Sequence, residues 1–219
     1  RLAGAITQGS GAVNEDGWGM IAEGGDVSAA WVFDGVTGIN GMSYLGSGSD
    51  AEWIVSKAHG HLRTLAVNDK PLPQILRALV DALKADWVDV TANLELPVNY
   101  DPPDACLILA KRYGERWDVL RLGDSCLIAK LGGTHEIVAA SPNNAFDHWL
   151  TNEAKRRGAS GRKDIKALLA EFRPQLQAAR QKRNKPGGYS ILEASDASLA
   201  MPEYLSFDKP EALLLCTDG

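Results

Sequence analysis

The sequence predicts an α+β domain in which helices cover a sheet of antiparallel strands. Two patterns support this prediction: two successive amphipathic helical segments in the first half, and short apolar runs joined by glycine turns in the centre. Strands this short are typical of antiparallel pairing and not of repeated βαβ units. The length of 219 residues suits a single domain.

The first half of the chain reads as one strand followed by two helices. Residues 27–33 (VSAAWVF) are a mostly apolar run that ends at an Asp-Gly pair. Ser49 and Glu52 have the spacing of a capping box, which predicts a helix over 49–66. A second helix is expected at 71–92, because its apolar residues recur on one face.

The second half reads as a meander of strands, then two helices and a last strand. Pro174 is expected to kink or restart the second of these helices. The expected strands are residues 105–110, 117–122, 126–129, 136–139 and 212–216, and the expected helices are residues 144–158 and 163–181.

Composition limits the classes of partner. The formal net charge of −5 argues against a nucleic-acid partner, because neutralising phosphates needs clustered Lys and Arg. No apolar run approaches the ~18–20 residues that span a bilayer, so no membrane partner is expected. Cys106, Cys126 and Cys216 each lie in an apolar run, which favours buried, reduced thiols. We therefore expect a cytoplasmic protein.

Acidic residues stand beside glycine, or at the end of an apolar strand, in four places. Carboxylates that converge repel one another unless a cation lies between them, and oxygen ligands without His or Cys favour a hard divalent metal. Each Asp-Gly pair by itself is typical of a turn, so the spacing leaves convergence open. The four places are Asn14-Glu15-Asp16-Gly17, Phe33-Asp34-Gly35, Gly123-Asp124-Ser125 and Thr217-Asp218-Gly219.

The order of these motifs resembles that of the PPM-type metal-dependent protein phosphatases (protein phosphatase type 2C), and we expect a divergent bacterial member. Residues 141–158 resemble the helix segment of that family that carries Asp-His and Glu-Leu. The other matches, in chain order, are N-E-D at Asn14 to Asp16, V-F-D-G at Val32 to Gly35, G-D-S at Gly123 to Ser125, and L-L-L-C-T-D-G at Leu213 to Gly219.

The resemblance implies a four-layer αββα fold, an antiparallel β-sandwich flanked by helix pairs on both outer faces. It also implies the hydrolysis of phosphoserine and phosphothreonine in a phosphorylated protein substrate. In such enzymes two Mg²⁺ or Mn²⁺ ions activate the water that bridges them, and this water attacks phosphorus. A third, weaker metal site belongs to the same pattern.

The resemblance also implies roles for individual residues. Asp34 would bridge the two metals, and Asp218 would hold one of them; these are the expected catalytic carboxylates. The Gly35 carbonyl would bind a metal, and Glu15 and Asp16 would act directly or through metal-bound waters. Asp124 matches the weaker third site, although it can equally be a turn residue that supports Asp218.

The chain departs from the family pattern in two places that affect phosphate chemistry. The family commonly has an Arg that grips the substrate phosphate where this chain has Gly11, so the phosphate-binding residue is unknown. Val36 stands where many relatives have a His. The basic run 181–185 is either a solvated helix end or a charged segment that attracts phosphorylated substrate.

The C-terminal end of the sequence also differs from the family. Relatives continue past the T-D-G motif to a strand that carries a further metal ligand, so we expect that residues 1–219 lack this strand. We also expect that they lack the start of the gene product. Three alternatives stay open: a weak or inactive phosphatase-like regulatory module, a phosphatase acting on small molecules, and a calcium-binding structural protein. His59, His61 and His148 are not expected to take part in catalysis.

Overall fold

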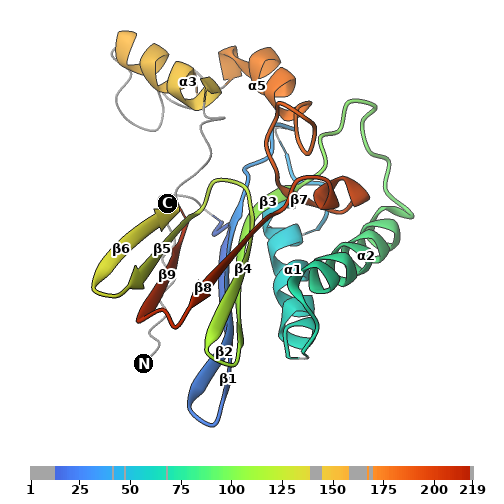
Figure 1. Cartoon of the computed structure of the whole chain (residues 1–219). Helices are drawn as coiled ribbons and strands as arrows, with labels where there is room; N and C mark the ends of the chain where they lie inside the picture. The colour runs from blue at the N-terminus through green and yellow to red at the C-terminus, as the bar shows by residue number, and fades with distance from the viewer. Residues whose placement is uncertain are drawn as a thin grey trace.

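Two antiparallel sheets face each other, and a pair of helices packs on the outer face of the larger one (Figure 1). The structure is a computed structural model. It describes residues 13–40, 42–46, 48–67, 69–138, 145–157, 167 and 170–217.

The larger sheet has the strand order β1-β2-β3-β4-β8, and β7 pairs with the start of β3. Its named strands all pair in antiparallel register within the described residues, as the short strands and glycine turns predicted. β1 and β8 were not expected from the sequence pattern. The strands are β1 (Asp16–Glu23), β2 (Asp26–Gly35), β3 (Asp104–Tyr113), β4 (Arg116–Leu122), β7 (Leu192–Glu193) and β8 (Glu203–Asp208).

The second sheet has three strands in the order β6-β5-β9. Its central strand, β5, pairs in antiparallel register with both neighbours. Cys126 and Cys216 lie opposite each other on β5 and β9, and both are only partly buried, whereas Cys106 on β3 is buried. Burial was therefore predicted correctly for one of the three thiols. The strands are β5 (Cys126–Leu131), β6 (Thr134–Val138) and β9 (Ala212–Cys216).

Alternation along the strands divides the apolar residues between two cores. On β3, Leu107 and Leu109 pack with the helices, whereas Ile108 and Ala110 face the second sheet. Successive side chains of a strand point to opposite faces, so one buried strand can serve both cores. This explains why β3 reads as a continuous apolar run and not as an alternating one.

The helices α1 (Asp50–Leu65) and α2 (Leu72–Thr91) form the layer predicted for this face of the sheet. The capping box at the start of α1 is confirmed: the Ser49 side chain accepts a hydrogen bond of 3.0 Å from the Glu52 N–H. Residues of both helices join Trp31 and Phe33 of β2 in the first core.

The α+β class with antiparallel sheets is confirmed, but the second pair of helices does not lie where the four-layer arrangement places it. α3 (Ala145–Arg156) and α5 (Arg173–Arg180) lie beyond one end of the sheets in Figure 1. Two arginines of α5 explain its position, because Arg173 and Arg180 donate to the carbonyls of Ile39 and Thr37. The η1 turn (Asp196–Leu199) lies against α2.

In the parts of the chain that the structure describes, no helix combines the length and the apolar character that crossing a bilayer requires.

The first core makes a direct prediction about stability. Leu109→Ala should lower the free energy of unfolding by ~2–5 kcal/mol, because Leu109 is fully buried between sheet and helices. Leu214→Ala is the control; Leu214 is 56% exposed, and its loss should cost about 0.5 kcal/mol or less. Urea denaturation of both variants measures the difference. Equal losses would contradict the assignment of β3 to the centre of the sheet.

Candidate functional site

The hairpin of β1 and β2 brings four of the predicted site residues to one end of the larger sheet. Asp16 lies directly opposite Asp34 in the register of the two strands. The Gly35 N–H donates a hydrogen bond of 3.1 Å to the carbonyl of Glu15. The backbones of Glu15, Asp16, Asp34 and Gly35 are therefore neighbours, and a common metal site for their oxygens stays a prediction.

Gly35 allows the close approach of the two strands at this point. A Cβ atom on Gly35 would lie 2.6 Å from the Glu15 carbonyl oxygen and 3.1 Å from the Glu15 Cβ. The first of these distances is too short for real atoms, so a larger residue would push Glu15 away from Asp34. The glycine beside the acidic residue thus has a steric reason in addition to its place in a turn.

Asp16, Asp34 and Cys106 form a row across three neighbouring strands. Asp34 is the register partner of Asp16 on β1 and of Cys106 on β3. Residues directly opposite in an antiparallel pair point to the same face, so the two carboxylates are neighbours and repel each other. Because Val32 and Ile108 pack in the core between the sheets, this row lies on the face toward the second sheet.

Asp124 extends this row on the side of β4. The thiol of Cys106 donates a hydrogen bond of 3.0 Å to the Asp124 carboxylate. Burial raises the pKa of the Cys106 thiol well above its usual value, and the charges of Asp124 and Asp34 raise it further. The thiol therefore stays protonated and holds Asp124 in place.

Gly123 makes the contact between Asp124 and Cys106 possible. Its φ of +90° lies in the region that glycine adopts most readily, and a Cβ atom there would lie 2.3 Å from the Cys106 sulfur. The chain can therefore turn from β4 toward Asp124 directly over Cys106.

Asp218 and Gly11 lie outside the described residues, so their predicted roles stay predictions. Of the T-D-G motif the structure describes Thr217, which follows the end of β9, where Cys216 pairs with Cys126, two residues after Asp124. Within the described residues, no three His, Cys, Asp or Glu side chains are grouped closely enough to hold a metal ion by themselves.

Thr37 is a site neighbour that the sequence analysis did not identify. Its hydroxyl donates a hydrogen bond of 2.5 Å to the Glu15 carboxylate. The only sequence signal is a hydroxyl residue two positions after the Asp-Gly pair, in the stretch where the family commonly differs from this chain. Glu15 is thus fixed at two points, through its carbonyl by Gly35 and through its side chain by Thr37.

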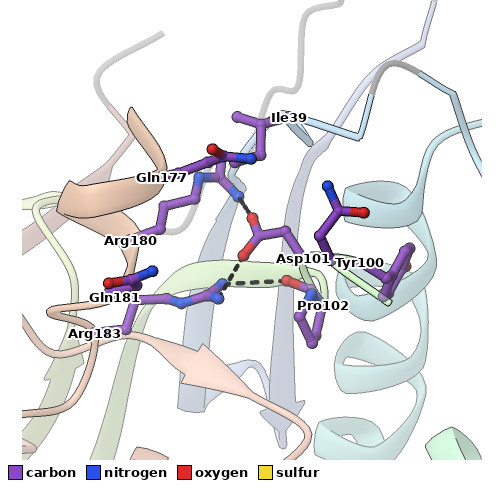
Figure 2. Close-up of a pocket in the computed structure, with 9 residues that line it drawn as sticks. Ile39, Tyr100, Asp101, Pro102, Gln177, Arg180, Gln181 and Arg183 are labelled. Atoms are coloured by element: carbon purple, nitrogen blue, oxygen red, sulfur yellow. Dashed lines mark hydrogen bonds and ion pairs between the residues drawn. The ribbon is translucent and has the colours of Figure 1, made fainter. Parts of the chain in front are cut away.

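Arg183, in the basic run 181–185, differs from both interpretations that the sequence allowed. It donates a hydrogen bond of 2.6 Å to Asp101 (Figure 2) and another of 2.6 Å to Asp104, which is fully buried. Its charge is therefore used inside the fold and is neither solvated nor available to a substrate. Lys182 and Lys185 are exposed.

His59 borders a cavity of about 290 Å³ that is also lined by Asp16 and Asn14. The indole N–H of Trp31 lies 3.4 Å from His59 Nδ1, and burial, followed by the nearby charge of Arg63, lowers the pKa of His59. A neutral, hydrogen-bonded His59 agrees with the packing role that we expected. The side chain of His148 lies outside the described residues.

Comparison with protein families gives one match over almost the whole chain. The family described as Protein phosphatase 2C matches residues 3–219. A comparison with curated protein sequences gives no significant match.

Comparison with solved structures gives matches of the same kind. The chain is similar to the serine/threonine phosphatase PstP/Ppp of Mycobacterium tuberculosis, with a TM-score of 0.54, 18% identity, and coverage of 94% of this chain and 73% of that one. It is also similar to a bacterial serine phosphatase, with a TM-score of 0.54, 14% identity and coverage of 94% and 72%. A third similar structure is PppA of Pseudomonas aeruginosa, described as a key regulatory component of the T6SS. Its TM-score is 0.52 and its sequence identity 15%, with coverage of 94% of this chain and 71% of that one. At these identities the similarity shows the fold.

The position of Cys106 under Asp34 and Asp124 can be tested by alkylation. In the native protein, iodoacetamide should modify Cys126 and Cys216 but leave Cys106 unmodified, because that thiol is buried and protonated. Unfolding in urea should make all three thiols react. Mass spectrometry of the alkylated peptides gives the result, and modification of native Cys106 as fast as Cys126 would contradict the described site.

Proposed function

This chain belongs to the protein phosphatase 2C family, and on that premise we propose that it hydrolyses phosphoserine and phosphothreonine in proteins with the help of divalent metal ions. The observation that supports the proposal most directly is the opposed pair Asp16 and Asp34, with Glu15 beside it. Opposed like charges destabilise a hairpin unless something offsets their repulsion. A divalent cation does so.

The residues present fit a hard metal ion. Glu15, Asp16 and Asp34 supply carboxylate oxygens, the ligands that Mg²⁺ and Mn²⁺ prefer. The missing Cβ of Gly35 lets its backbone approach Glu15, since a side chain there would collide with the Glu15 carbonyl. The described residues do not complete a ligand set, and the proposal assigns the remaining ligand to Asp218.

Each residue has a proposed part in holding two Mg²⁺ or Mn²⁺ ions. Asp34 is proposed to bridge both ions, with the Gly35 carbonyl on one and Asp218 on the other. Glu15 and Asp16 act directly or through metal-bound waters. Asp124 holds a weaker third ion or supports Asp218, and its bond to Cys106 keeps it oriented in either case.

The metals, when bound, supply a water acidic enough to attack phosphorus near neutral pH and offset the charge of the phosphoryl oxygens. The chain itself orients the proposed metal ligands. Asp34 lies on a central strand that is hydrogen-bonded on both sides, so its carboxylate has a fixed position at the sheet end. Fixed ligands lower the cost of assembling the reacting groups.

The proposed mechanism predicts the effect of losing the bridging carboxylate. Asp34→Asn should reduce hydrolysis of a phosphothreonine peptide at least about a hundredfold, because even indirect metal partners contribute ten- to a hundredfold. EDTA should abolish wild-type activity and added Mn²⁺ should restore it. The measurement is phosphate release by the full-length protein.

Asp26→Asn is the matched control for Asp34→Asn. Asp26 is an acidic residue at the other end of the same hairpin, where it is 73% exposed and pairs with Arg112. Its loss should leave activity unchanged. Wild-type activity that survives both EDTA and Asp34→Asn would overturn the mechanism. Metal binding without any turnover would favour the phosphatase-like regulatory module.

The absence of the family's phosphate-binding Arg leads to a gain-of-function prediction. Gly11→Arg should lower the KM for the phosphothreonine peptide by about tenfold, because a guanidinium makes strong charge-assisted bonds to phosphate. Gly11→Gln adds a side chain of similar reach without the charge and should leave the KM near the wild-type value. An equal KM in both variants would show that position 11 does not face the substrate.

A further inference from the structure

Arg180 connects α5 to the segment that follows Asp34 and Gly35. Its guanidinium donates a hydrogen bond of 2.6 Å to the Asp101 carboxylate and another of 2.6 Å to the Thr37 carbonyl. Arg180 is 8% exposed, so its guanidinium is largely buried although Thr37 lies at the surface. Figure 2 shows the first of them beside a cavity of about 380 Å³.

The acceptor of Arg180 is itself held in place. Asp101 also accepts a bond of 2.6 Å from Arg183. Its backbone N–H and carbonyl each form a 2.9 Å bond to the Asn40 side chain. Asp101 therefore binds Arg180 through its carboxylate and the segment 36–40 through its backbone.

Segment 36–40 is hydrogen-bonded along its length. The Val36 N–H donates to the Asp104 carbonyl at 3.1 Å, and the Ile39 carbonyl accepts from Arg173. Between these points, Arg180 binds the Thr37 carbonyl. A backbone held at three places leaves the Thr37 side chain little freedom to choose another partner.

The Thr37 hydroxyl is directed at Glu15. It donates to Glu15 Oε2 at 2.5 Å, so a continuous series of contacts runs from Arg180 through Thr37 to the carboxylate. Hydrogen bonds to a metal-binding carboxylate orient it and contribute to metal affinity.

We propose that Thr37 and Arg180 are positioning residues that set the Glu15 carboxylate for metal binding; this inference rests on the proposed function. Thr37 acts on the carboxylate and Arg180 acts on Thr37. The helix α5, which is distant from the hairpin in sequence, thereby tunes the affinity of the site for its metal.

A purely structural role for Arg180 makes a different prediction from a positioning role. Arg183 offers the comparison, because it binds the same Asp101 and is similarly buried, but its other acceptors in the described structure are Pro102 and Asp104 and not Thr37. Removing it leaves the buried Asp104 without its closest partner, so Arg183→Gln should cost at least as much stability as Arg180→Gln. Comparing these two variants therefore separates an effect on stability from an effect on metal affinity.

The test measures the dissociation constant for Mn²⁺ by calorimetric titration of the full-length protein. Thr37→Val removes the hydroxyl and should weaken binding on the order of tenfold. Thr37→Ser keeps the hydroxyl and should restore binding to near the wild-type value. Both changes lie at an exposed position and leave the carbonyl that Arg180 binds.

Arg180→Gln should weaken Mn²⁺ binding in the same direction, and adding it to Thr37→Val should have little further effect, because both act through one contact. Arg183→Gln should leave the affinity within about twofold of wild type while lowering the Tm, because Arg180 keeps its bond to the Thr37 carbonyl and Asn40 still holds Asp101. If Arg180→Gln does not fold, the comparison of Thr37→Val with Thr37→Ser decides.

Two results would overturn the positioning role alone: equal Mn²⁺ affinity in Thr37→Val and Thr37→Ser, or an equal loss in Arg180→Gln and Arg183→Gln. A wild-type protein that binds no Mn²⁺ would overturn the proposed function, and this inference with it. Titration of the wild-type protein therefore distinguishes a failure of the positioning role from a failure of the proposed function.

Discussion

The register between β1 and β2 is the constraint on which the candidate site depends. It places Asp16 opposite Asp34 on the face toward the second sheet. A slip by one residue would turn Asp16 to the face that packs on α1 and α2, away from the face that carries Asp34. The hairpin therefore holds two carboxylates together against their repulsion, and the packing of the opposite face supplies the stability for it.

Glycines on β1 fit that packing. Trp31 and Phe33 fill the core beneath α1, and a Cβ on Gly19 would lie 2.5 Å from the Trp31 ring. A Cβ on Gly17 would lie 2.7 Å from Val55. Both positions need glycine for close packing and not for a turn. The high glycine content of the chain thus contributes to the same register that brings the acidic residues together.

Local patterns predicted the parts of the fold that local chemistry determines. The capping box at Ser49, the amphipathic helices and most strands follow from neighbouring residues. β1 was missed because its glycines interrupt the alternation of apolar residues. Arg183 was misjudged because its partners, Asp101 and Asp104, lie about eighty positions away, and sequence patterns carry no record of such pairs. The contact between Thr37 and Glu15 is invisible to spacing for the same reason.

The acidic row and the contacts of α5 support the proposed metal site, because Asp34 lies on a strand paired on both sides and Thr37 holds the Glu15 carboxylate. Anomalous diffraction at the manganese edge, from crystals of the full-length protein grown with Mn²⁺, tests this account most directly. The account predicts a peak within about 2.2 Å of an Asp34 oxygen, close to the coordination distance of small divalent ions. Manganese bound elsewhere and not at Asp34, in crystals that hydrolyse a phosphopeptide, would contradict it.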